Sequence, residues 1–333
     1  MKKSGQINVI AGILILILTT CFTNCKKPDN PLRFPKGTIP DSIINVDDIN
    51  SPYDDYNTAL YQIGQTLPII FSSNRRSSGG QFDLEQASLT ITFDQTTGVF
   101  TFGSKMTTDT FLDKLTGKAT TQGNDFGPYR LFSTEDGFEY LLLSSVNQAG
   151  NLDFYYLKNL PVSGSLVPDV SGPYPVKLMN TSSDDAYITL NQLQDTAYFS
   201  SDKDGNFDIF YLKKPAETAL SDWFNFDYTL PARADSLNGT YNDKCPFILK
   251  KVMVFASDRP GGFGGYDLYY SILKNGKWGK PVNLGPRINT SSDEYRPVIG
   301  AIQDFTNQFL MFSSNRPGGK GGFDLYFTGI TFP

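Results

Sequence analysis

Acidic residues recur at two positions in each of five similar stretches of the chain. Their carboxylates can exchange protons or bind a cation. One acid occurs in each of five stretches, as Asp55, Asp125, Asp185, Asp243 and Glu294. A second acid follows an aromatic residue or Leu in each stretch, as Asp83, Asp153, Asp208, Asp267 and Asp324. An active site needs each catalytic group once, so this regularity singles out no catalytic pair. We interpret the second set as structural, with carboxylates that accept backbone N–H bonds and pair with Arg259 and Arg316.

The chain contains no histidine, which excludes Ser-His-Asp and Cys-His catalysis and every histidine metal site. Asp202 to Asp208 has the D-x-D-G-x-x-D spacing of some calcium loops, although the same residues also form an ordinary repeat turn. We therefore predict no catalytic residue, no metal and no cofactor, and calcium stays an alternative. Hydrolysis of glycosides by two carboxylates is the catalytic alternative that the composition allows.

The elements that would position these acids form a repeat. A strand ending in a Ser-Ser-Asn-Arg type of motif precedes a glycine-bearing turn and a second strand, most clearly in 309–327, FLMFSSNRPGGKGGFDLYF. The second set of acids is spaced 55 to 70 residues apart, which is room for four short strands and their turns. Such a unit is one blade of a β-propeller.

We predict an all-β propeller of five blades, each of four antiparallel strands, with six blades as the alternative. Residues 88–103 alternate around Thr96-Thr97-Gly98, which predicts an extended hairpin within the first blade. Residues 41–50 match 281–289, so the N-terminal strand should complete the last blade as its outer strand and remove two open sheet edges. No stretch shows a sustained helical period.

The residues Trp278 to Gly285, the last repeat at 309–327 and Asp204 to Phe210 resemble the WD-repeat-like propeller repeat of TolB-type and OmpA-associated envelope proteins of bacteria. The resemblance covers nearly all of the chain after about residue 40. It implies an exported protein of the cell envelope that binds a partner. No OmpA-like peptidoglycan-binding domain is expected after Pro333.

The N-terminus has the pattern of a bacterial lipoprotein signal peptide. Lys2 and Lys3 precede an apolar stretch too short for a comfortable membrane span, and two cysteines follow it. We predict a signal peptide over 1–24, lipidation of Cys25 with Cys21 as the competing site, a lipidated tether over 25–40 that does not pack, and a propeller over 41–333. The predicted location is the bacterial outer membrane, with the side it faces left open.

Net charge and cysteine usage limit the possible partners. The formal charge of −5 argues against nucleic acid, because phosphate binding needs a basic surface. With Cys25 acylated and the signal peptide removed, Cys245 is the one remaining thiol, and we expect it to be a small buried residue.

The main functional prediction is a non-catalytic, envelope-anchored module that binds a protein, peptidoglycan or glycan partner. A purely structural envelope component is a further alternative. The positions after the recurring acid differ in every blade, so they should face the central channel. The predicted contact residues are Asp55, Asp185, Tyr187, Lys244, Glu294 and Arg296.

Overall fold

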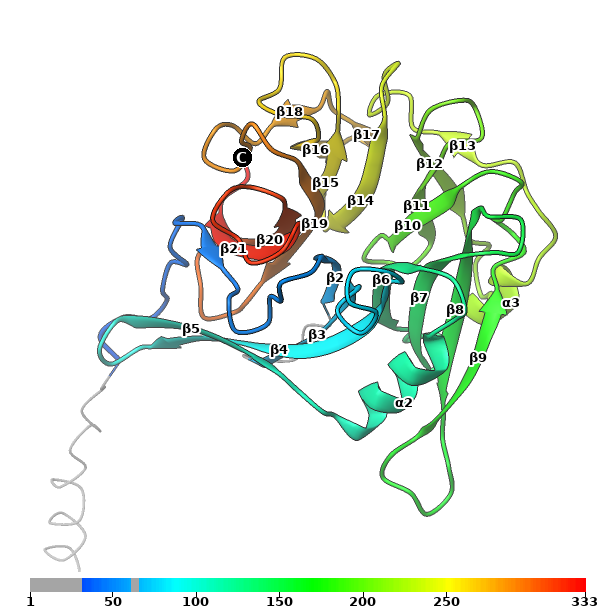
Figure 1. The fold of residues 1–333 in the computed structure, drawn as a ribbon, viewed down its shortest axis with the longest axis horizontal. Coiled ribbons are helices and arrows are strands. Elements are labelled where there is room, and N and C mark those ends of the chain that lie inside the picture. The colour runs from blue at the N-terminus through cyan, green and yellow to red at the C-terminus, as the bar shows by residue number, and fades with distance from the viewer. Residues whose placement is uncertain (1–31, 61–65) are drawn as a thin grey trace, which may run out of the picture.

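The chain folds into five antiparallel sheets arranged around a common centre (Figure 1). The structure is a computed structural model, and it describes residues 32–60 and 66–333. The innermost strand of each sheet contacts the innermost strands of both neighbouring sheets, which makes a closed ring. The predicted five-bladed propeller is therefore confirmed, and the six-bladed alternative is wrong.

The blades follow one another along the chain, and each begins at one of the recurring acids. Blade 1 consists of β2 (Asp55–Leu60), β3 (Thr66–Ser73), β4 (Asp83–Asp94) and β5 (Val99–Met106). Blade 2 consists of β6 (Asp125–Phe132), β7 (Glu139–Val146), β8 (Leu152–Leu160) and β9 (Asp169–Pro175). The predicted hairpin over 88–103 is present as the long β4–β5 pair, whose far end projects beyond the ring in Figure 1.

The remaining three blades repeat this order with shorter outer strands. Blade 3 consists of β10 (Asp185–Leu190), β11 (Thr196–Ser201), β12 (Asp208–Lys213) and β13 (Ala232–Arg233). Blade 4 consists of β14 (Asp243–Leu249), β15 (Val252–Ser257), β16 (Asp267–Lys274), β17 (Lys277–Trp278) and β18 (Val282–Asn283), the last two both pairing with β16. Blade 5 takes three strands from the C-terminus, β19 (Glu294–Ala301), β20 (Gln308–Ser314) and β21 (Asp324–Ile330).

The fourth strand of blade 5 comes from the N-terminal segment, as predicted. Strand β1 (Ile44–Asn45) pairs antiparallel with β21 and covers its edge. Asn50 then holds Leu325, accepting from its N–H at 2.9 Å and donating to its C=O at 3.0 Å. Asn289 binds Leu268 in the same way between blades 4 and 5, so the closure repeats a contact used elsewhere in the ring.

Packing of the chain begins before residue 41, so the prediction that 25–40 does not pack is wrong for its last part. Gly37 forms a parallel bridge with Phe305, and its N–H donates to the Asp304 carbonyl at 2.8 Å. Ile39 is 1 % exposed and belongs to the core between blades 5 and 1. The predicted signal peptide, Cys21 and Cys25 lie outside the described residues.

Five separate apolar cores hold the ring together, and each lies between two neighbouring blades. Phe154 and Phe199, for example, meet edge to face between blades 2 and 3 with ring centroids 5.7 Å apart. Alternate side chains of the middle strands point to opposite faces of each sheet, so every blade contributes to two cores. When the ring closes, the facing sides of blades 5 and 1 are therefore buried as well.

Two helices were not predicted. Helix α2 (Thr110–Ala119) fills the gap between β5 and β6, with Leu112, Leu115 and Ala119 buried against blades 1 and 2. Asp109 caps its first turn by accepting from the backbone N–H groups of Phe111 and Leu112. The second, α3 (Leu220–Phe224), buries Trp223 and Phe224. Neither helix has the length and apolarity to cross a bilayer, nor does any other helix within 32–60 and 66–333.

Candidate functional site

A β-bulge is repeated in each inner strand and places one residue of the strand at the centre of the ring. The register of the first strand pair shifts two residues after the recurring acid in every blade. The bulged residues have left-handed backbones with φ between 46° and 62°, and they are Asn57, Gly127, Tyr187, Cys245 and Arg296. A bulge re-aims a side chain, and these five positions lie in the channel, as the sequence predicted.

Neighbouring blades are joined at the mouth of the channel by a ring of Asp and Asn side chains. Each side-chain oxygen accepts the backbone N–H of the residue before the hairpin acid of the preceding blade, at distances from 2.7 to 3.1 Å. The ring consists of Asp54, Asn124, Asp184, Asn242 and Asp293. These contacts fix the orientation of the loops that carry Phe82, Leu152, Phe207, Tyr266 and Phe323.

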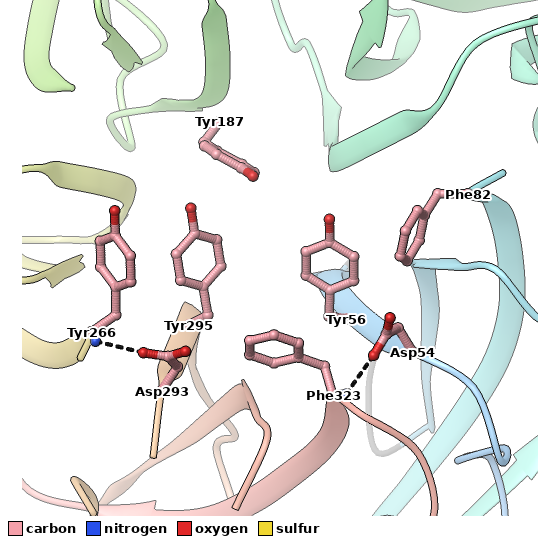
Figure 2. A pocket seen from close by; sticks show the side chains of 8 residues that line it. All are labelled: Asp54, Tyr56, Phe82, Tyr187, Tyr266, Asp293, Tyr295 and Phe323. Atoms are coloured by element: carbon pink, nitrogen blue, oxygen red, sulfur yellow. Dashed lines mark hydrogen bonds between the residues drawn. The ribbon is translucent and has the colours of Figure 1, made fainter. Parts of the chain in front are cut away.

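A pocket of about 320 Å³ opens at this mouth. It is lined by six aromatic side chains and two carboxylates, which are Asp54, Tyr56, Phe82, Tyr187, Tyr266, Asp293, Tyr295 and Phe323. Figure 2 shows the tyrosines of three blades with their hydroxyl groups directed toward Tyr187, and Phe323 between the two carboxylates. The aromatic rings support one another, since Tyr266 and Tyr295 meet edge to face at 5.3 Å.

Burial raises the pKa of Tyr56, Tyr187, Tyr266 and Tyr295 above the ordinary tyrosine value. All four therefore remain protonated at neutral pH, and each hydroxyl can donate as well as accept a hydrogen bond. Their rings offer flat apolar faces beside these hydroxyls. Such a pocket suits a ligand that has both C–H faces and many hydroxyl groups.

The two pocket carboxylates belong to the ring of Asp and Asn residues, yet that ring does not require a charge. Asn124 and Asn242 make the same backbone contact in blades 2 and 4 through an amide oxygen. Asp54 and Asp293 are half-buried. One oxygen of each accepts the backbone contact, and the second accepts from a side-chain amide, that of Asn74 at 3.4 Å for Asp54 and that of Asn315 at 3.2 Å for Asp293. The ring contact does not need their charge, so these two residues are the acidic groups that the pocket offers.

The predicted contact residues Asp55, Asp185 and Glu294 do not line this pocket. All three have no exposed surface, because each folds back onto the residue four positions earlier. Glu294, for example, accepts from the Thr290 N–H at 2.8 Å and from the Ser314 hydroxyl at 3.0 Å. The inner-strand acids therefore hold neighbouring strands and turns of the scaffold together through hydrogen bonds.

Arg259 and Arg316 pair with these inner acids and not with the hairpin acids, which corrects the pairing expected from the sequence. Arg259 binds Asp243, and Arg316 binds Glu294 at 3.0 Å. The hairpin acid Asp267 instead accepts the N–H groups of Phe263 and Gly264, and Asp324 accepts those of Lys320 and Gly321, which confirms the backbone part of the prediction for these two blades. The other three hairpin acids bind side chains, which are those of Gln81, Asn147 and Arg233.

Blades 2 and 3 lack such an arginine. The equivalent residues are Asn147 and Lys203, and the Lys203 ammonium pairs with Asp204 at 3.1 Å. Burial consequently raises the pKa of Asp125 and of Asp185 to about 6, although hydrogen bonds to Thr121 and Thr181 oppose the shift. At about 6, these pKa values bring the change of charge of both acids close to neutral pH.

The other predicted contact residues surround the pocket or lie beneath it. Tyr187 lines it directly. The Lys244 ammonium lies 3.9 Å from the centre of the Phe207 ring and 5.5 Å from that of Tyr266, and burial lowers its pKa. Arg296 is 1 % exposed and stacks on Tyr187. Cys245 is fully buried, as predicted, and burial raises the pKa of its thiol to about 11.

The loop with calcium spacing has other contacts. Asp208 binds the Arg233 guanidinium with both oxygens, at 2.7 and 2.9 Å. Asp202 accepts the Asp184 N–H at 2.8 Å. A cation would have to displace Arg233, and no group of three potential ligands converges in the part of the chain that the structure describes.

Sequence reasoning missed Asp54, Phe82, Tyr266, Asp293 and Phe323. Their signal was present, because an Asp or Asn precedes every recurring inner acid and an aromatic residue or Leu precedes every recurring hairpin acid. The sequence interpretation relied on the constant acids, whereas five of the eight lining residues lie one position before such an acid, and Tyr56, Tyr187 and Tyr295 follow one.

No protein-family profile matches the chain, and no curated protein sequence matches it. Solved structures do resemble it. An endo-arabinase from Bacteroides thetaiotaomicron superimposes with a TM-score of 0.54 at 9 % identity, covering 88 % of this chain and 98 % of the other. A thermostable family-43 glycoside hydrolase gives 0.53 at 12 % identity, covering 85 % and 93 %. An α-L-arabinofuranosidase from Lactobacillus brevis gives 0.52 at 11 % identity, covering 87 % and 95 %.

At these identities the likeness establishes the shared propeller fold. It also corrects two expectations from the sequence. The resemblance to TolB-type repeats holds for propeller architecture only, since the similar solved structures are glycoside hydrolases. The same finding overturns the main prediction of a non-catalytic binding module that is not an enzyme, and favours the alternative of a carboxylate-based glycoside hydrolase.

Proposed function

We propose that this protein is a glycoside hydrolase that cleaves a polysaccharide or oligosaccharide in the pocket at the mouth of the propeller, with Asp54 and Asp293 as the two reacting carboxylates. The observation that carries the proposal is the lining of this pocket, which combines aromatic faces, protonated phenols and two carboxylates from adjacent blades. The fold shared with arabinan-degrading enzymes supports the same reaction class.

Each part of the lining has a role in this reaction. The aromatic faces pack against the C–H faces of a sugar ring, and the hydroxyls of Tyr56, Tyr187, Tyr266 and Tyr295 bind sugar hydroxyls. One carboxyl group protonates the leaving glycosidic oxygen, and the other carboxylate activates water or attacks the anomeric carbon. The backbone contacts from Tyr266 and Phe323 hold the two carboxylates in place, at 2.8 and 2.7 Å.

The substrate class follows from the pocket and from the enzymes that share the fold. We propose that the substrate is a neutral polysaccharide of plant type, cleaved in its backbone or in its side chains. Arabinan, arabinoxylan and galactan are the first candidates, because the similar structures are named for arabinan, arabinofuranoside and galactan cleavage. We further propose that lipidation of Cys25 anchors the enzyme to the outer membrane of a bacterium, on the strength of the N-terminal sequence pattern.

A screen for released reducing ends tests the proposed reaction. The purified protein is incubated with arabinan, arabinoxylan, galactan and the matching chromogenic glycosides at pH 5 to 8. The proposal predicts hydrolysis of at least one substrate and competition by its monosaccharide product. Binding of these glycans without any bond cleavage, or no interaction with any of them, would contradict it.

A further inference from the structure

A buried arginine crosses the central channel beneath the pocket. Arg296 leaves blade 5 at a bulge, and its Nη2 donates to the Pro128 carbonyl of blade 2 at 3.1 Å. Blades 5 and 2 are not neighbours, so the side chain spans the channel. Its guanidinium stacks on Tyr187 at 5.6 Å from the ring centre, and Tyr187 lines the pocket above.

The positive charge of Arg296 has no negative partner within residues 32–60 and 66–333. Its Nε and Nη1 atoms are buried without a hydrogen bond, and it forms no salt bridge. The surrounding groups are neutral, since burial raises the pKa of the Cys245 thiol to about 11 and of Tyr295 above its usual value. The arginines of the repeat motif, Arg75, Arg259 and Arg316, each bind a carboxylate.

An unpaired buried charge is costly, because it has lost its hydration without gaining a counter-charge. The cation–π contact with Tyr187 and one carbonyl offset a part of that cost. Two donor atoms remain unused on the same guanidinium, and their natural partner is an anion.

A second side chain of the channel is also unsatisfied. Asn57 occupies the equivalent bulge in blade 1, next to blade 5 in the ring, and its side chain has no exposed surface. Its amide lies near the hydroxyls of Tyr56 and Tyr187, yet neither its nitrogen nor its oxygen forms a hydrogen bond of full geometry in the described structure.

We propose that the channel beneath the pocket binds one small inorganic anion of halide size, held by Nε and Nη1 of Arg296 together with the amide of Asn57. The anion neutralises the buried guanidinium and keeps it stacked under Tyr187, so it supports the floor of the pocket. The inference does not depend on the proposed hydrolase activity.

Thermal unfolding with and without chloride tests this site. The purified full chain is melted in sodium chloride and in sodium gluconate at the same ionic strength, because gluconate is an organic anion much larger than a halide. We expect a saturable increase of Tm with chloride, about 4 to 6 °C at a concentration about a hundred times the Kd. Arg296→Gln should lose this increase. Arg316→Gln removes a paired arginine, so it should be less stable and still keep the increase.

A crystal of the unaltered protein soaked in bromide provides a second measurement, the position of the bound anion, that does not depend on how the variants fold. The proposal predicts an anomalous bromide peak at hydrogen-bond distance from Nε or Nη1 of Arg296. It is overturned if only water lies there, or if Arg296→Gln responds to chloride as strongly as the unaltered protein does.

Discussion

Lys203→Arg should stabilise the protein at neutral pH and leave its stability in acid unchanged. In blade 5, the Nη2 atom of Arg316 reaches both Glu294, at 3.0 Å, and the Ile288 carbonyl, at 2.7 Å. Lys203 occupies the equivalent position of blade 3, where its ammonium points to Asp204 and leaves the buried Asp185 without a cation. An arginine at 203 restores the contact that three other blades have.

The magnitude follows from the pKa of Asp185, which burial raises from 3.8 to about 6. The folded protein binds this proton more tightly than the unfolded chain does, so its stability decreases as pH rises from about 4 to about 6. Two pKa units correspond to about 3 kcal/mol at pH 7. A charged hydrogen bond contributes about 1.5 to 3 kcal/mol, and ordering the new side chain costs part of it. We expect a net gain of about 1 to 2 kcal/mol at pH 7 and almost none at pH 4.

Urea unfolding at half-unit intervals from pH 4 to pH 8 measures this effect. The free energy of unfolding of Lys203→Arg should depart from that of the unaltered protein above about pH 5 and remain higher. Lys213→Arg, at an exposed position near the end of β12, is the matched control and should change nothing. An equal gain for Lys203→Arg at pH 4 and pH 7 would refute the assignment of the effect to Asp185.

Three further predictions concern the closure of the ring, the pocket and the N-terminal cysteine. Ile49→Ala removes a side chain that is 1 % exposed at the closure and should cost about 2 to 5 kcal/mol, whereas Val282→Ala, which is 47 % exposed, should cost less than about 1; similar losses in urea unfolding would argue against the closure. Gly127→Ala places a Cβ 2.7 Å from the Tyr187 ring at φ +58°, so it should lower kcat/KM at least about tenfold and stability by about 1 to 3 kcal/mol; unchanged kinetics would place the substrate elsewhere. Cys25→Ala should abolish labelling with a palmitate analogue, and retained labelling would assign the lipid to another residue.

The repeat made most of the fold predictable. Its five acids mark the starts of the inner strands, and the match of 41–50 to 281–289 located the closing strand, because both are local patterns copied along the chain. Helix α2 was missed because it occurs once, although Asp109 and the spacing of Leu112, Leu115 and Ala119 carry a cap and a helical face.

The site was harder to predict than the fold. A sequence shows that Asp55 recurs, but it does not show that its carboxylate turns back to the Ser51 N–H while Asp54 faces the pocket. Two neighbouring residues on a strand point to opposite sides, so an error of one position exchanges a scaffold acid for a pocket acid. The aromatic lining comes from hairpin loops and inner strands of different blades and is assembled only when the ring closes.

The most direct test of the proposed function compares three Asp→Asn variants at one structural position. Asn already makes the ring contact in blades 2 and 4, so all three substitutions should preserve the fold. Asp54 and Asp293 line the pocket, whereas Asp184 does not. On the best substrate of the screen, Asp54→Asn and Asp293→Asn should each reduce kcat/KM by about 10²- to 10⁴-fold, and Asp184→Asn should retain it within about twofold. Equal activity of all three variants would contradict the assignment of the two carboxylates and with it the proposed active site.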